Sequence, residues 1–79
     1  MENFTVYFTN QIDRESKALE VFLKDELIAH AQLNLCSNMA HVQILEKQRK
    51  KLNDLSINGY DIEVAIEDRE ISHNRILIK

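Results

Sequence analysis

The side chains that could act as nucleophiles, bases or metal ligands are one cysteine, three histidines and several serines. Cys36 with a histidine could in principle form a thiolate–imidazole pair, the arrangement that activates a cysteine nucleophile. No residue spacing supports this chemistry, because the chain has no CxxC, HExxH or GxSxG motif. Its single glycine also excludes a Gly-rich nucleotide loop. The sequence therefore predicts a protein that is not an enzyme.

Metal binding is the second chemistry that these residues suggest. His30 and His73 occupy equivalent positions in an internal sequence similarity, and Cys36 could add a third zinc ligand. The three residues are dispersed, however, and a histidine on the polar face of a strand produces the same pattern. We therefore expect no metal site and no bound cofactor.

Four cations lie within five residues of the second half of the chain, at Lys47, Arg49, Lys50 and Lys51. On a helix, three of them share a face with Asp54, while Arg49 lies nearer the apolar side. Several cations on one face can contact nucleic-acid phosphates or an acidic protein surface. A solvated helix face has the same pattern. These four residues are candidate partner-binding or phosphate-binding positions.

Length, charge and composition narrow the class of protein. The 79 residues correspond to one small domain, 1–79, and 44% hydrophobic with 29% charged residues is typical of a folded chain. A net charge of −3 is too small for a DNA mimic and has the wrong sign for a wholly basic nucleic-acid binder. With one cysteine, no basic leader and no long apolar run, we expect a cytoplasmic protein without a membrane span.

The first half of the chain is dominated by strand-like alternation. Residues 3–9 alternate large apolar side chains with Thr and Tyr, which predicts a strand. Residues 10–17 are polar and highly charged, so a loop or a short helical turn is expected there. Residues 18–35 fit both a period of two and a helical stripe, so periodicity alone leaves a hairpin and a helix as alternatives.

An internal similarity favours the hairpin. Residues 19–35 align with residues 62–78 without a gap, with five identities and four Leu-for-Ile exchanges. The second copy is rich in β-branched residues, which disfavour a helix, so we expect repeated hairpins. Each turn would lie in a charged centre, at 24–26 and 67–70. Because neither centre contains glycine, a loop of about four or five residues is expected instead of a tight two-residue turn.

The segment between the two copies predicts a long helix. Ser37 or Asn38 can cap its start, and Gly59 after Asn58 is the kind of residue that ends a helix. The predicted fold is therefore α+β, an antiparallel sheet of order β-β-β-α-β-β with one helix packed on one face. The apolar stripe of this helix consists of Val42, Leu45, Leu52 and Leu55, widened by Met39 and Ile44.

Two function classes follow from these patterns. The first is a small non-catalytic protein-binding module, an inhibitor or regulator that docks a sheet edge or the helix face onto another protein. The richness of the chain in Ile, Lys and Asn fits an AT-rich coding sequence, such as that of a bacteriophage or mobile element. The alternative is a nucleic-acid-binding regulator that uses the basic helix 47–51 against phosphate, as a homodimer. An open sheet edge could also support a homodimer under the first hypothesis.

Overall fold

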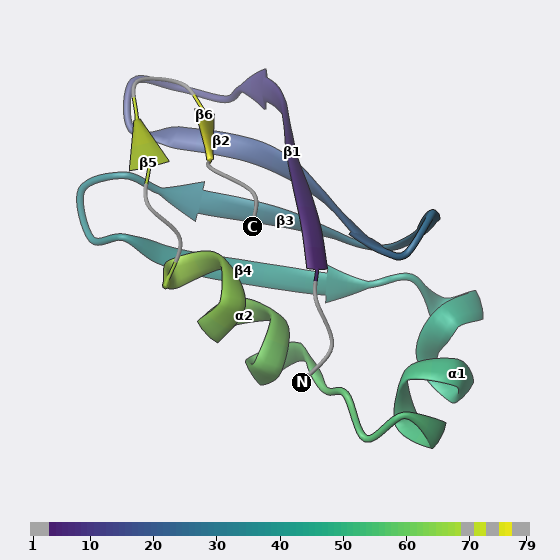
Figure 1. The fold of residues 1–79 in the computed structure, drawn as a ribbon. Coiled ribbons are helices and arrows are strands. Elements are labelled where there is room, and N and C mark those ends of the chain that lie inside the picture. The colour runs from purple at the N-terminus through teal and green to yellow at the C-terminus, as the bar shows by residue number, and fades with distance from the viewer. Residues whose placement is uncertain (1–3, 69–70, 73–74, 77–79) are drawn as a thin grey trace.

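The chain forms an antiparallel sheet that is followed by two helices. The structure is a computed structural model and describes residues 4–68, 71–72 and 75–76. Strands β1 to β4 pair in the order of the sequence, each with its neighbour (Figure 1). The elements are β1 (Phe4–Gln11), β2 (Ser16–Leu23), β3 (Glu26–Asn34), β4 (Met39–Ile44), the 3-10 helix η1 (Glu46–Gln48), α1 (Arg49–Asp54), α2 (Gly59–Glu67), β5 (Ile71–Ser72) and β6 (Arg75–Ile76).

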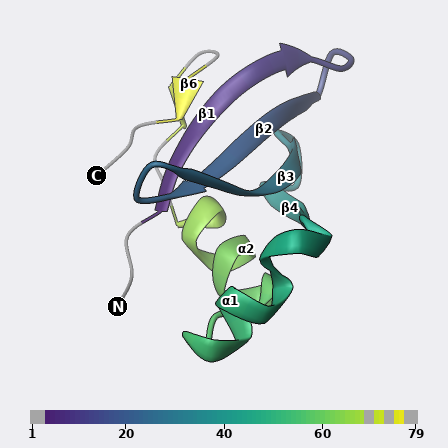
Figure 2. The ribbon, with the colours of Figure 1, turned by 90° about the vertical axis from the view of Figure 1, so that its right-hand side faces the viewer.

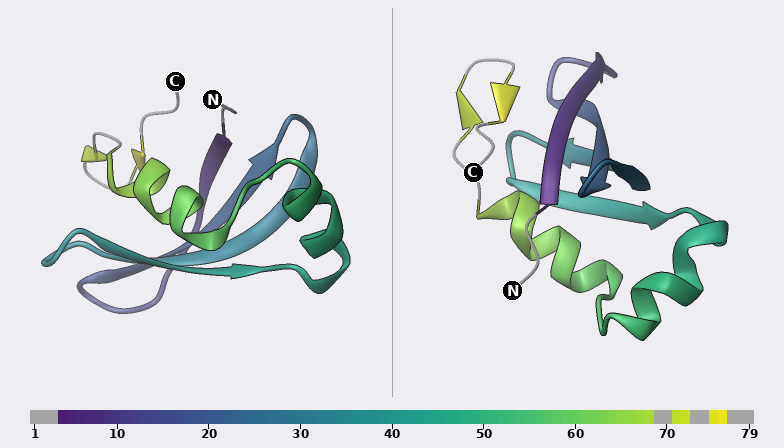
Figure 3. Two further views of the ribbon diagram at one scale, coloured as in Figure 1. Left: turned by 90° about the horizontal axis from the view of Figure 1, so that it is seen from below. Right: turned by 45° about the vertical axis from the view of Figure 1, so that its right-hand side comes forward.

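The helices lie on one side of the sheet (Figure 2). Helix α2 runs along β4, while η1 and α1 lie beyond the end of β4 (Figure 3). The Gln48 side chain donates a hydrogen bond of 3.1 Å to the carbonyl of Leu27, which fastens η1 to β3. Lys51 on α1 pairs with Glu26 at the start of β3. These contacts place α1 beside the turn between β2 and β3.

The inner face of the sheet forms the core with α2. Successive side chains of a strand point to opposite faces, so burial mostly alternates along the strands. The neighbours Ile28 and Ala29 are both buried, at an irregularity in the pairing of β2 with β3. Ile62 and Ile66 of α2 are fully buried in the same cluster, and α2 packs mainly against β4. The buried apolar side chains of the strands are Phe4, Val6, Leu19, Val21, Leu23, Ile28, Ala29, Ala31, Leu33 and Ala40.

The outer face of the sheet is polar. On β3 and β4, His30 lies opposite Gln43 and Gln32 lies opposite His41, and all four residues are exposed. On β1 and β2, the Tyr7 ring packs edge-on against Phe22 with centroids 5.4 Å apart. Because the outer face is polar and can stay in contact with water, only the apolar inner face has to pack against a helix.

The strand at 3–9 and the hairpin at 18–35 are confirmed as β1 and as β2 with β3. The predicted loop at 10–17 is shorter, because β1 extends to Gln11 and β2 begins at Ser16. The expected loop of four or five residues between β2 and β3 is wrong. Leu23 pairs with Glu26, which leaves only Lys24 and Asp25 in the turn.

Lys24 takes the conformation that this tight turn requires, with φ of 57°. Because a Cβ disfavours this region, Lys24→Gly is expected to raise the free energy of unfolding by about 0.5–1 kcal/mol. Urea denaturation would measure the gain. Asp25→Gly is the matched control, at a neighbouring position where φ is not positive. A gain in the control and not at Lys24 would contradict the turn geometry.

The predicted order β-β-β-α-β-β is wrong, because the segment after Asn38 begins with a strand and not with a helix. Asn34 accepts hydrogen bonds from the backbone N–H groups of Cys36 and Ser37, and Asn38 adopts φ of 58°. Together they make a turn that returns the chain antiparallel to β3. Residues 39–44 then follow a period of two, with Ala40 buried and its neighbours exposed. Of the predicted helix, only 46–54 is helical.

The second predicted hairpin is also wrong, because α2 occupies its first half. Asn58 begins this helix by accepting a hydrogen bond from the Asp61 N–H, while the Asp61 carboxylate accepts one from the Asn58 N–H, both at 2.9 Å. Gly59 therefore starts a helix and does not end one. Burial of two isoleucines one turn apart outweighs their β propensity. The rest of the second copy is described only at β5 and β6.

Candidate functional site

Helix α2 has two stripes of side chains with different surroundings. Ile62 and Ile66 form the stripe that is buried against the sheet. Beside it lies a second stripe with i, i+3, i+4 and i+7 spacing, which places its members on one helix face. Its two central members are apolar and half-buried, and its two outer members are carboxylates. This second stripe consists of Asp61, Val64, Ala65 and Asp68.

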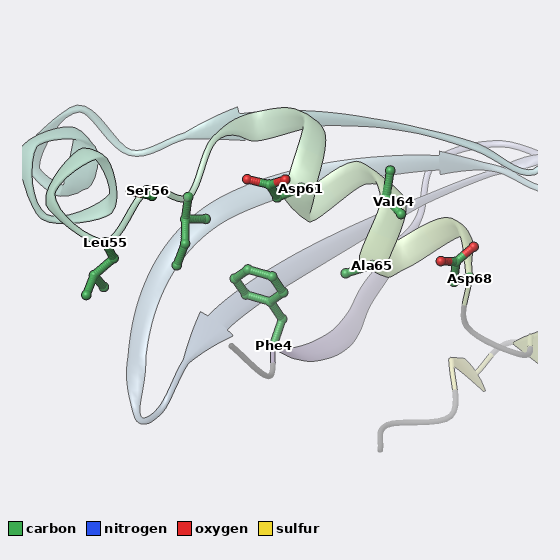
Figure 4. Close-up of a pocket in the computed structure, with 8 residues that line it drawn as sticks. Phe4, Leu55, Ser56, Asp61, Val64, Ala65 and Asp68 are labelled. Carbon is green, nitrogen blue, oxygen red and sulfur yellow. The ribbon is translucent and has the colours of Figure 1, made fainter. Parts of the chain in front are cut away.

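The second stripe forms one wall of a groove of about 600 Å³. Figure 4 shows Phe4, from the start of β1, beneath α2, with Val64 and Ala65 on the helix beside it. The segment between α1 and α2 closes the other end with Leu55, Ser56 and Ile57. We call this feature the α2 groove. Phe4 in its floor is buried, Val64 and Ala65 on its wall are half-buried, and Leu55 at its end is 44% exposed.

Local backbone geometry positions the end of the groove. Ser56 has φ of 60°, and the Ile57 N–H donates a hydrogen bond of 2.8 Å to the carbonyl of Leu52. This is the kind of left-handed residue that ends a helix, and it turns the chain from α1 toward α2. Ile57 is buried by the turn, while Leu55 remains at the surface. The Asn58–Asp61 capping box then sets the direction of α2.

The α2 groove lies in the most acidic part of the described chain. Residues 55–68 contain four carboxylates and no Lys or Arg. Two of them, Glu67 and Asp68, lie at the C-terminal end of α2, and the last turn contains no basic residue. The partial negative charge of a helix C-terminus adds to theirs. The end of the groove at Asp68 therefore carries negative charge.

The four predicted basic residues lie together on η1 and α1 and are all exposed. Lys47, Lys50 and Lys51 share one face with Asp54, as expected from helical spacing. Three of the four cations are paired within the chain. Arg49 pairs with Glu46 at 2.7 Å, Lys50 with Asp54 at 3.2 Å and Lys51 with Glu26 at 2.5 Å. These pairs place carboxylates beside three of the four cations that a phosphate would contact.

The Lys51–Glu26 pair gives a pH-dependent prediction. The hydrogen bond and the charge of Lys51 hold the pKa of Glu26 below its usual value. A lowered carboxyl pKa adds stability above the unfolded pKa, and that stability is lost as pH falls through the folded pKa. Lys51→Met is therefore expected to lower the melting temperature slightly at neutral pH and not in strong acid. In a Glu26→Gln background, the same substitution should show no such pH dependence.

Neither sheet edge is a simple open docking strand. The backbone N–H of Ala40 on β4 donates to the Glu67 carboxylate at 2.9 Å, and the Asn38 amide donates to the Glu67 carbonyl at 3.2 Å. The end of α2 thus occupies part of the β4 edge, a common protection against edge pairing. Along the other edge, β6 lies next to β1.

Cys36 is exposed on the turn between β3 and β4. A hydrogen bond to Glu15, together with the charge of that carboxylate, raises the pKa of the thiol. A raised pKa reduces the thiolate fraction at neutral pH, the opposite of what activates a cysteine nucleophile. Glu15→Gln is therefore expected to accelerate alkylation of Cys36 by iodoacetamide. Alkylation that is slowed by this substitution would show that Glu15 does not restrain the thiol.

The zinc hypothesis needed His30 and Cys36 to meet His73, which lies outside the described residues. Among the residues that the structure describes, no three His, Cys, Asp or Glu side chains are grouped to hold a metal ion. Within the same part of the chain, no helix has the length and apolar character needed to cross a membrane.

Sequence reasoning missed the α2 groove, although a signal for it was present. The i, i+3, i+4, i+7 pattern from Asp61 to Asp68 follows directly after the Asn58 capping box. Both were hidden by reading 62–78 as a strand hairpin. The groove also needs Phe4, which lies at the opposite end of the sequence and cannot be placed by local patterns.

Comparison with protein-family models, with curated proteins and with solved structures finds no match to this chain.

Proposed function

We propose that this protein is a small non-catalytic protein-binding module, an inhibitor or regulator that docks onto another protein through the α2 groove. The observation that carries the proposal is the groove itself, an apolar hollow open to solvent between α2 and β1. Concave apolar surfaces with a few polar groups at the rim are typical binding sites. The phage or mobile-element origin remains a proposal from composition.

The surroundings of the groove suit a protein partner. Tyr60, one turn before Val64, is 70% exposed, and Leu55 adds an exposed apolar side chain at the end of the groove. Tyrosine is enriched among the residues that contribute most to protein interfaces. A groove of this kind accepts an apolar anchor from a partner segment, as in other helix-lined grooves.

Nucleic-acid binding by residues 47–51, with a homodimer, is the weaker proposal. Phosphate contacts require available cations, and three of these four side chains form ion pairs with carboxylates of their own chain. The acidic segment 55–68 follows directly and would repel a nucleic-acid backbone. A homodimer that binds nucleic acid through this basic surface is therefore the alternative that the experiment must distinguish from docking through the α2 groove.

A pull-down from cell lysate with a groove variant tests the proposal. Ala65→Gln places a polar side chain in the groove while keeping a residue type that favours helices. Ala18→Gln is the matched control, because Ala18 is also half-buried but lies on the outer face of the sheet. We expect a stoichiometric protein band that survives nuclease, is lost with Ala65→Gln and is retained with Ala18→Gln.

Two results would contradict the proposal. Equal capture by both variants would place the contact away from the α2 groove. Ultraviolet-absorbing material that disappears on nuclease treatment, in place of a protein band, would favour the basic helix and nucleic acid. Circular dichroism of both variants establishes that each remains folded before binding is compared.

A further inference from the structure

We infer that the α2 groove binds a basic segment of the partner protein, in which an apolar side chain lies between cationic side chains. This inference rests on the proposed function and names the chemistry of its partner. It follows from the charge around the groove, from the position of that charge on α2 and from the spacing of two carboxylates along the groove.

The local charge is more negative than that of the whole chain. Residues 55–68 have a formal charge of −4 from Asp61, Glu63, Glu67 and Asp68, while the chain as a whole has −3. Three cations of α1 pair with Glu26, Glu46 and Asp54, so these three ion pairs do not neutralise α2. A surface of one sign attracts partners of the opposite sign and repels those of the same sign.

Two of the carboxylates, Glu67 and Asp68, lie where a negative charge does not favour the helix. Anions stabilise a helix at its N-terminus and destabilise it at its C-terminus. Asp61 fits this rule, because it takes part in the capping box at the start of α2. Glu67 and Asp68 at the end of α2 oppose it, and no basic residue lies in the last turn. A cation bound beside Asp68 would relieve this unfavourable charge.

The spacing along the groove matches an apolar residue between two cations. Asp61 and Asp68 lie on one face of α2, about 10 Å apart along the helix axis at 1.5 Å per residue. Val64 and Ala65 lie between them and are half-buried. One Asp61 oxygen is held by the Asn58 N–H. Asp68 is exposed and is therefore the better position at which to test the charge.

The experiment uses the full chain with three short synthetic peptides. The first contains several lysines on both sides of a central phenylalanine; in the second, glutamate replaces lysine, and in the third, serine replaces phenylalanine. Binding is measured by fluorescence anisotropy and by amide chemical shifts. We expect only the first peptide to bind well, with shifts at Asp61, Val64, Ala65 and Asp68 and with affinity that falls as salt is raised.

Asp68→Lys is expected to weaken binding of the first peptide by at least about tenfold, because it reverses the charge at the rim of the groove. Asp25→Lys is the matched control, with the same charge change at the exposed turn between β2 and β3. Equal effects of both variants would show that only net charge matters and would overturn the inference. Equal binding of the glutamate peptide would also overturn it.

The outcome separates this inference from the proposed function. A lysate partner that is lost with Ala65→Gln, combined with no binding of the lysine peptide, would leave the protein-binding module in place and remove the basic segment. If Ala65→Gln changed neither capture from lysate nor binding of the lysine peptide, both the proposed docking through the α2 groove and the basic partner segment would be wrong. Self-association that Asp68→Lys abolishes, measured by analytical ultracentrifugation, would identify a second copy as the occupant and overturn the basic partner segment.

Discussion

Replacement of Ile66 by alanine is expected to lower the free energy of unfolding by roughly 2–5 kcal/mol. Ile66 is completely buried between α2 and the inner face of the sheet, and the smaller side chain would leave a cavity there. A chain of 79 residues has a total stability of about 4–12 kcal/mol, so a large part of it would be lost. Urea denaturation followed by circular dichroism measures the change.

Two further substitutions make this prediction specific to the packing of α2. Ile66→Val removes one methyl group and is expected to cost about 0.5–1.5 kcal/mol. Val64→Ala, on the half-buried wall of the α2 groove, should cost less than Ile66→Ala although both positions lie on the same helix. If Val64 were the more sensitive position, the face of α2 that packs on the sheet would be wrong.

The first half of the fold could be predicted from sequence because its strands are regular. Residues of β1 alternate apolar and polar side chains, and this period indicates a strand. For β2 and β3 the period also fitted a helix, and only the similarity to 62–78 favoured the hairpin. The length of the loop at 10–17 was missed, and so was the tight turn at Lys24. Its backbone conformation is unusual for a lysine, so the residue type carried no signal for it.

The boundary between β4 and α1 could not be predicted, because apolar spacing there fits two structures. Val42 and Leu45 belong to the predicted helical stripe, yet Val42 is in β4 and Leu45 follows it. A stripe with a period of 3.6 can be assembled from two short elements of different type. The decisive features are the turn made by Asn34 and Asn38 and the pairing of β4 with β3.

The similar segments 19–35 and 62–78 adopt different structures for a physical reason. The same Leu/Ile and Glu-Val pattern forms β2 in the first copy and α2 in the second. Apolar residues at i and i+4 lie on one face of a strand and on one face of a helix alike. The Asn58–Asp61 capping box directly precedes the second copy and selects the helix, whereas Glu15 and Ala18 stand at the equivalent positions before the first copy.

The shared face of Lys47, Lys50, Lys51 and Asp54 was predicted from helical spacing, but the ion pairs of the basic residues were not. Sequence shows four cations in five positions and cannot show that Lys51 reaches Glu26, which is 25 residues away. Long-range pairing of this kind depends on the tertiary fold. The same limitation hid the α2 groove, which joins Phe4 to a helix near the other end of the chain.

Lys17 is a buried cation that no local pattern identified. It lies on the inner face of β2, opposite Leu33 of β3, and is only 2% exposed. Its ammonium nitrogen is 4.9 Å from the centroid of the Phe8 ring. The electron-rich face of an aromatic ring attracts a cation, and the apolar stem of lysine can be buried with the core. The position therefore suits a long side chain whose end is positive.

Lys17→Glu is expected to lower the free energy of unfolding by at least about 3 kcal/mol, because it buries a carboxylate against the face of Phe8. Lys17→Met keeps the length and the apolar stem and is expected to cost only about 1 kcal/mol. Lys24→Glu is the control for the same charge change on an exposed turn, where the effect should stay within about 0.5 kcal/mol. Urea denaturation compares all three variants. A Lys17→Glu effect as small as that of Lys24→Glu would mean that position 17 is open to water, and the inner face of β2 would then end at Leu19.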